Sequence, residues 1–87
     1  GSYIGTSSDF YIAVVAAKES KIYLPTSVRD GKIIIIKSEM KPPLVGRTIT
    51  ITTSDGSTID GYKEDKITVS HDCRTYIYNN SNWHRIS

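Results

Sequence analysis

The segment at residues 32–37 has the sequence KIIIIK, with four consecutive isoleucines between two lysines. Successive side chains of a β-strand point to opposite faces, so Ile33 and Ile35 face one side. Ile34 and Ile36 then face the other. A sheet with one wet face alternates apolar and polar residues instead. Both faces of this strand therefore require cover, since fully burying each isoleucine is worth about 1.5–3 kcal/mol.

The size of the chain limits how much cover it can supply. A chain of 87 residues forms one domain with one thin core and buries only about 60–65% of the surface that it exposes when unfolded. The single cysteine, Cys73, excludes an internal disulfide. Gly1 and Ser2 resemble the remnant of a cleaved expression tag, so we expect residues 3–87 to form a single domain cut from a longer protein.

The pattern of short apolar runs and turn residues predicts an all-β fold. Asp-Gly pairs at 30–31, 55–56 and 60–61 indicate turns. Residues 47–53 alternate, with Ile49 and Ile51 on one face and threonines on the other. About eight short strands at this spacing predict a small sandwich or barrel. We expect strands at residues 10–16, 21–24, 32–37, 47–53, 58–59, 66–70, 74–78 and 83–86.

A second segment shares the problem of the four isoleucines. In residues 11–16, YIAVVA, apolar side chains again point to both faces, with Tyr11 on one side and Val14 on the other. One explanation is a central strand covered on both sides within the monomer. The other is a neighbouring chain that covers one face. Two such strands favour intimate association of subunits, with Ile33, Ile34, Ile35, Ile36 and Val14 in the core or the interface.

His71, Asp72 and Cys73 form the only cluster that resembles a reactive site. A cysteine nucleophile needs a base that a third group orients, and neighbours along a strand or turn point apart. We therefore expect a plain turn here, although a threefold axis could bring three copies of His71 together around a metal. We expect no catalytic residue, no resident metal and no cofactor.

The aromatic residues are better candidates for binding, because their rings offer flat apolar area with a polar edge. Tyr76 and Tyr78 share one strand face, opposite Ile77. Tyr62 stands beside a turn and precedes three charged residues, so we expect it to be exposed. For Trp83 we favour a position in the core or at a subunit interface.

Several pieces of the chain, in this order, resemble the C-terminal head or tip domains of trimeric fibres. Such domains occur on bacteriophage tails, on some large DNA viruses and on some bacterial surfaces. The resemblance departs at residues 38–46, which contain Pro42 and Pro43, and at the sequence HDC of residues 71–73. The pieces are KIYLP (21–25), GKIIIIK (31–37), TITI (48–51), DGSTIDGY (55–62), KITV (66–69) and NNSNWHRI (79–86).

The resemblance implies a β-sandwich, jelly-roll-like domain that assembles as a homotrimer. It also implies a non-enzymatic role on the virion surface or outside the cell, where the head attaches to a host receptor, often a glycan, and registers three chains. The loops at residues 38–46, 54–57 and 60–65 are the expected contact surface. The candidate contact residues are Tyr62, Lys63, Pro42, Pro43, Asp55, Tyr76 and Tyr78.

Two other functions compete with the fibre head. The first is a monomeric carbohydrate-binding module of a larger enzyme, which would show one aromatic platform and a monomer mass. The second is a small barrel that binds nucleic acid, but its clustered basic residues are missing, because charges of both signs alternate and the net charge is +2. We therefore expect no nucleic-acid partner. No apolar run is long enough to cross a bilayer, so we also expect no membrane insertion.

Overall fold

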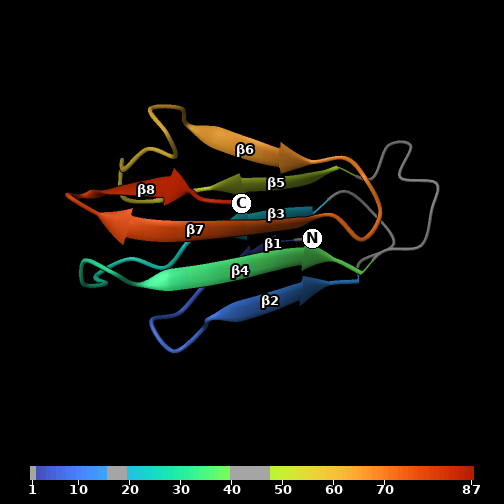
Figure 1. The fold of residues 1–87 in the computed structure, drawn as a ribbon, viewed down its shortest axis with the longest axis horizontal. Coiled ribbons are helices and arrows are strands. Elements are labelled where there is room, and N and C mark those ends of the chain that lie inside the picture. Colours follow the sequence, from blue (N-terminus) through green and yellow to red (C-terminus); the bar gives the residue numbers. More distant parts are fainter. Residues whose placement is uncertain (1, 16–19, 40–47) are drawn as a thin grey trace.

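The computed structural model describes residues 2–15, 20–39 and 48–87, and all regular structure within them is β. Two four-stranded sheets face each other (Figure 1). In spatial order, sheet A consists of β1 (Ser2–Ile4), β3 (Ser20–Tyr23), β5 (Ile49–Thr52) and β6 (Glu64–Ile67). Sheet B consists of β2 (Tyr11–Val14), β4 (Ile33–Ser38), β7 (Cys73–Asn79) and β8 (Asn82–Arg85). The expected sandwich of about eight strands is confirmed.

From β1 to β5 the chain passes to the other sheet after every strand. Consecutive strands of one sheet therefore run in the same direction, and β1–β3, β3–β5 and β2–β4 are parallel pairs. The three pairs that involve β6, β7 and β8 are antiparallel. A jelly roll is built from antiparallel strands, so the jelly-roll-like arrangement is wrong for the first half of the chain.

The core lies between the two sheets and is formed by alternate residues of their strands. Ile49 and Ile51 are fully buried, as their alternation with threonine predicts. Val14 and Trp83, expected in the core or at an interface, both belong to the core. The core cluster comprises Ile12, Val14, Ile22, Leu24, Ile34, Ile36, Ile49, Ile51, Ile59, Ile67, Tyr76 and Trp83.

Two local features differ from the expected strands. Strand β1 was not among them, because its three exposed residues carry no pattern that would reveal a strand. The expected strand at residues 58–59 is reduced to isolated bridges from Ile59 to Tyr62 and Trp83. The Asp-Gly turns are confirmed, since Gly31, Gly56 and Gly61 all have positive φ.

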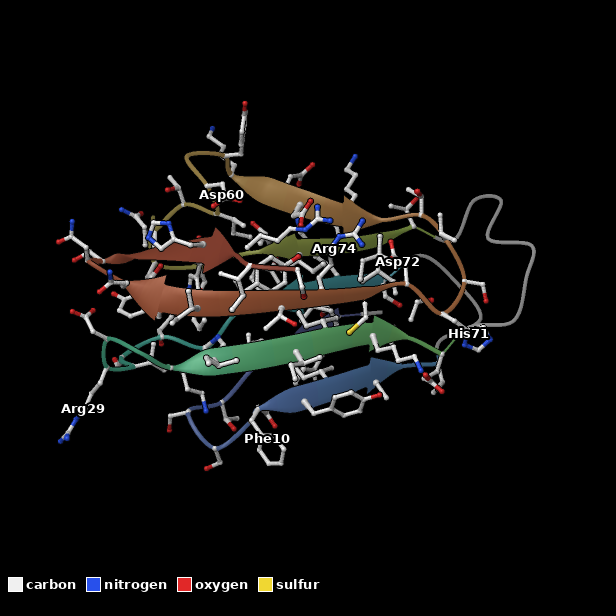
Figure 2. The ribbon with its side chains drawn as sticks, viewed as in Figure 1. Phe10, Arg29, Asp60, His71, Asp72 and Arg74 are labelled. Carbon is white, nitrogen blue, oxygen red and sulfur yellow. The ribbon has the colours of Figure 1, made fainter. Side chains whose placement is uncertain are left out.

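A polar cluster closes the sandwich between β6 and β8. Asp65 Oδ2 accepts a 2.7 Å hydrogen bond from the Tyr76 hydroxyl and lies 3.7 Å from Arg85 Nη1 and 3.9 Å from Arg74 Nε. Figure 2 shows Arg74 between β7 and β6. Burial, and then the hydrogen bond to Asp65, raises the pKa of Tyr76 far above its ordinary value. The hydroxyl therefore stays protonated and joins the two sheets.

Candidate interaction surface

The outer face of sheet B is mostly apolar. Pairing across β2, β4 and β7 places Tyr11, Ile35 and Thr75 in one row. The adjacent row of β4, β7 and β8 contains Ile33, Ile77 and His84. Ala13, Lys37 and Cys73 form the third row. Lys37 is the only lysine, arginine, aspartate or glutamate among these nine described residues, and Glu39 lies 3.1 Å from its ammonium group.

The outer face of sheet A has the opposite character. Lys21, Thr50 and Lys66 form one row, and the next row contains Tyr23, Thr52 and Glu64. Thr50 is buried although it faces outward. The aliphatic stems of its two lysine neighbours can cover a central threonine while their charges stay in water. Sheet A therefore has the polar outer face of a solvated sheet, which sheet B lacks.

Exposure along β4 follows the expected alternation. Ile34 and Ile36 are fully buried between the sheets, whereas Ile33 is 43% exposed and Ile35 is half-buried. Tyr11, in the row of Ile35, is 46% exposed. The single chain therefore does not enclose all four isoleucines. The exposed apolar residues of these rows are therefore a candidate interaction surface.

A second group of candidates lies where β5 ends and β4 begins (Figure 1). Asp55, Tyr62 and Lys63 are all exposed there, and Tyr62 exposes 72% of its surface. Asp55 accepts hydrogen bonds from the Ser57 hydroxyl and amide, at 2.6 and 3.0 Å, which lower the pKa of its carboxyl group. The turn at Asp55 is therefore stabilised in its charged form.

A tight hairpin, closed by the bridge between Ile59 and Tyr62, is attached to the start of β8. Asn82 Oδ1 accepts hydrogen bonds from the amide and the hydroxyl of Thr58, at 2.8 and 3.0 Å. The Asp60 amide donates to the Trp83 carbonyl at 3.0 Å. Beside Tyr62 is a shallow hollow of about 210 Å³, which Ile59, Asp60, Tyr62, Glu64, Asp65 and Arg85 line. These residues could offer a ring face, carboxylates and a guanidinium group to a bound molecule.

The remaining candidate contacts have other positions. Tyr76 is fully buried, so its assignment as a receptor contact is wrong: its ring belongs to the core and its hydroxyl binds Asp65. Tyr78 is half-buried and packs edge-on against Trp83, with ring centroids 5.2 Å apart. Pro42 and Pro43 lie outside the described residues.

The cluster at residues 71–73 lies where the turn after β6 enters β7, and Cys73 is the first residue of β7. His71 has a φ of 62° and is exposed, and Figure 2 shows it projecting from the end of the molecule. The hydrogen bond from Arg74 is the largest cause that lowers the pKa of Asp72. In the part of the chain that the structure describes, no three His, Cys, Asp or Glu residues form a group suited to a metal ion.

Sequence reasoning missed two parts of these surfaces. Ile77 belongs to the apolar outer face. The sequence pattern that could have identified it is its position between Tyr76 and Tyr78, whose side chains point to the opposite face of β7. The cluster of Asp65, Arg74 and Arg85 joins three consecutive strands of two different sheets, so it forms only when the sheets pack and no local sequence pattern predicts it.

The chain matches no protein-family model and no curated protein. Across the described ranges, no helix has the length and apolar character needed to span a bilayer.

Proposed function

We propose that this domain is the non-enzymatic head of a trimeric fibre, which holds three chains in register and attaches to a host or target surface. The apolar outer face of sheet B is the observation that supports the proposal. Sheet A has charged residues at the corresponding positions, so the apolar residues of sheet B are not a general property of the fold. Packing against two other copies would remove Ile33 and Ile35 from water.

In this proposal the two candidate surfaces have different tasks. The outer face of sheet B joins the three chains, while the loop end with Asp55, Tyr62 and Lys63 stays free for contact. Three identical contact sites on one rigid head raise avidity well above the affinity of a single site when the target offers spaced copies. Weak contacts at each hollow beside Tyr62 would then be sufficient for attachment.

The trimer is tested by placing a charge in the apolar face. We expect the unaltered domain to sediment as a trimer and Ile35→Lys to sediment as a folded monomer, because three buried ammonium groups near one axis would repel each other. The matched control is Ile4→Lys, since Ile4 is 69% exposed on the sheet A side. This variant should remain trimeric. Circular dichroism checks that both variants fold.

A stable monomer of the unaltered domain at micromolar concentration would contradict the fibre head and favour the monomeric carbohydrate-binding module. If Ile35→Lys is still a trimer, the oligomer would be supported, but its interface could not be the outer face of sheet B. The two outcomes therefore separate the function from the surface assigned to it.

Attachment is tested with Tyr62→Ala in the intact trimer. The ring is exposed and makes no contribution to the core, so we expect the variant to keep its mass and thermal stability. Its binding to glycan arrays or to host surface material should fall at least about tenfold, since avidity multiplies the loss at each site. Unchanged binding would exclude Tyr62 as a contact. No binding by the unaltered trimer would leave only the registration role.

A further inference from the structure

The hollow beside Tyr62 lies at the loop end that the proposed function assigns to attachment. Every residue that lines it belongs to the described part of the chain. Its volume of about 210 Å³ is below the range of about 300–1,000 Å³ that is usual for pockets enclosing a small molecule. The hollow therefore suits a small group that is held from one side and stays partly in water.

Two charged side chains of the hollow keep unused hydrogen-bonding capacity. Asp60, in the loop that leads into β6 (Figure 2), accepts the Arg85 amide at 3.3 Å, and among the described residues no lysine or arginine pairs with its carboxylate. The Arg85 guanidinium donates through Nε to the Ser87 carbonyl at 3.0 Å, while its Nη1 lies 3.7 Å from Asp65, too far for a hydrogen bond. A carboxylate has about four acceptor positions and a guanidinium has about five donors. Both groups can therefore hydrogen-bond to a ligand.

The other two carboxylates of the hollow have cationic neighbours. Lys66 Nζ lies 3.6 Å from the Glu64 carboxylate. Arg74 Nε and Arg85 Nη1 lie 3.9 and 3.7 Å from Asp65 Oδ2. Charges of both signs therefore surround the hollow. A ligand with a charge of its own would be attracted by one sign and repelled by the other, so the electrostatics favour neither an anion nor a cation.

Tyr62 adds an aromatic ring, 72% exposed, to these donors and acceptors. The ring offers a flat apolar face to C–H groups. A hydroxyl group both donates and accepts hydrogen bonds, so it matches a carboxylate and a guanidinium at the same time. We propose that the hollow binds an uncharged sugar ring, which lays its apolar face against Tyr62 and directs its hydroxyl groups to Asp60 and Arg85. The inference rests on the proposed attachment role and assigns the class of ligand.

The probes are the methyl glycosides of glucose and galactose, each compared with the matching uronic acid and amino sugar, so that the members of a series share one ring and differ in charge. NMR titration follows the amides of Ile59, Asp60 and Tyr62. We expect the neutral member of at least one series to shift these amides, and the two charged members to bind at least about threefold more weakly. Raising the salt concentration from about 20 to about 500 mM should change the neutral affinity less than about twofold, because salt screens charges.

Asp60→Asn is the variant that links binding to this hollow. Asp60 has a φ of 51°, which asparagine also adopts readily, and the asparagine side chain keeps an oxygen for the Arg85 amide. The melting temperature should stay unchanged, while the neutral affinity falls at least about fivefold, because an acceptor is replaced by a donor. The matched control is Asp30→Asn, in another Asp-Gly turn. Asp30 accepts the Asn80 amide at 3.1 Å and does not line the hollow, so this variant should bind like the unaltered domain.

Three outcomes would overturn the inference. Equal sugar binding by Asp60→Asn and the unaltered domain would exclude this hollow. A uronic acid or amino sugar that binds as tightly as the neutral member, or more tightly, would exclude the ligand class. No amide shift with any probe would exclude sugar binding, while a trimer mass would still support the registration role. A monomer that binds a neutral sugar through Asp60 would support the inference and contradict the fibre head, so the two failures are distinguishable.

Discussion

Tyr76 brings a hydroxyl group to the margin of a core that is otherwise built from aliphatic side chains and one tryptophan. Its ring is fully buried, so the hydroxyl depends on Asp65 for its hydrogen bond. A buried polar group without a partner destabilises a fold. The hydrogen bond between Tyr76 of β7 and Asp65 of β6 therefore links the two sheets at one defined position.

We predict that Tyr76→Phe lowers the free energy of unfolding by about 1.5–3 kcal/mol, the range for a hydrogen bond to a charged group. The ring stays in place, so the loss comes from the carboxylate of Asp65, which loses its 2.7 Å donor. Urea denaturation measures the change. The control Tyr62→Phe removes a hydroxyl from an exposed ring and should have no effect. Equal stability of both variants would contradict the role of the hydroxyl.

The same residue makes stability depend on alkaline pH. The pKa of Tyr76 is raised in the folded state, so above the ordinary value of 10.0 the unfolded chain releases this proton first. The contribution of Tyr76 is fully present below pH 10 and is lost as the pH rises further. Melting temperatures measured from pH 8 to pH 11 should fall more steeply for the unaltered domain than for Tyr76→Phe. Parallel profiles would contradict this assignment.

At the scale of elements, the hairpin that contains Tyr62 is held in place mainly by side-chain hydrogen bonds, because it has no long run of paired strand residues. The bridge between Ile59 and Tyr62 is isolated, and Asn82 provides the bonds that attach Thr58 to β8. Tyr62 thus depends for its position on a residue twenty positions away in the sequence.

We predict that Asn82→Ala lowers the free energy of unfolding by about 1–2 kcal/mol, because it leaves the Thr58 amide without its acceptor. Exchange of the Ile59 amide, which donates to the Tyr62 carbonyl at 2.8 Å, should accelerate more than that of β4 amides. Asn79→Ala is the control, since Asn79 is exposed at the end of β7. Uniform acceleration across the domain would show a global rather than a local effect.

The elements also show what the sequence could predict. Alternation divided the isoleucines of β4 between two opposite faces and placed Ile49 and Ile51 of β5 on one face, because the period of a strand is local. It did not identify strand partners, so the parallel winding from β1 to β5 was missed. Tyr76 was misplaced for the same reason: the pattern separates it from Ile77, but only its pairing with Ile34 decides which of the two faces the core.

At the scale of the whole molecule, apolar surface remains in two places that belong to one sheet. One is the outer face of sheet B around Ile35, and the other is its free edge at β2. The two surfaces meet at β2, since Tyr11 and Ala13 stand in rows of the outer face and belong to the edge strand.

The single cysteine reports on the face without any change to the core. Cys73 is exposed and stands on the outer face of sheet B, in the row of Ala13 and Lys37. If three copies pack through this face, we predict that the thiol reacts with a disulfide reagent at least about tenfold more slowly in the trimer than in the Ile35→Lys monomer, because reaction requires access to the thiolate. Absorbance of the released thiolate measures both rates. Ile4→Lys should match the unaltered domain. Equal rates in trimer and monomer would place Cys73 outside the subunit contact and restrict that contact to the rows of Ile33 and Ile35.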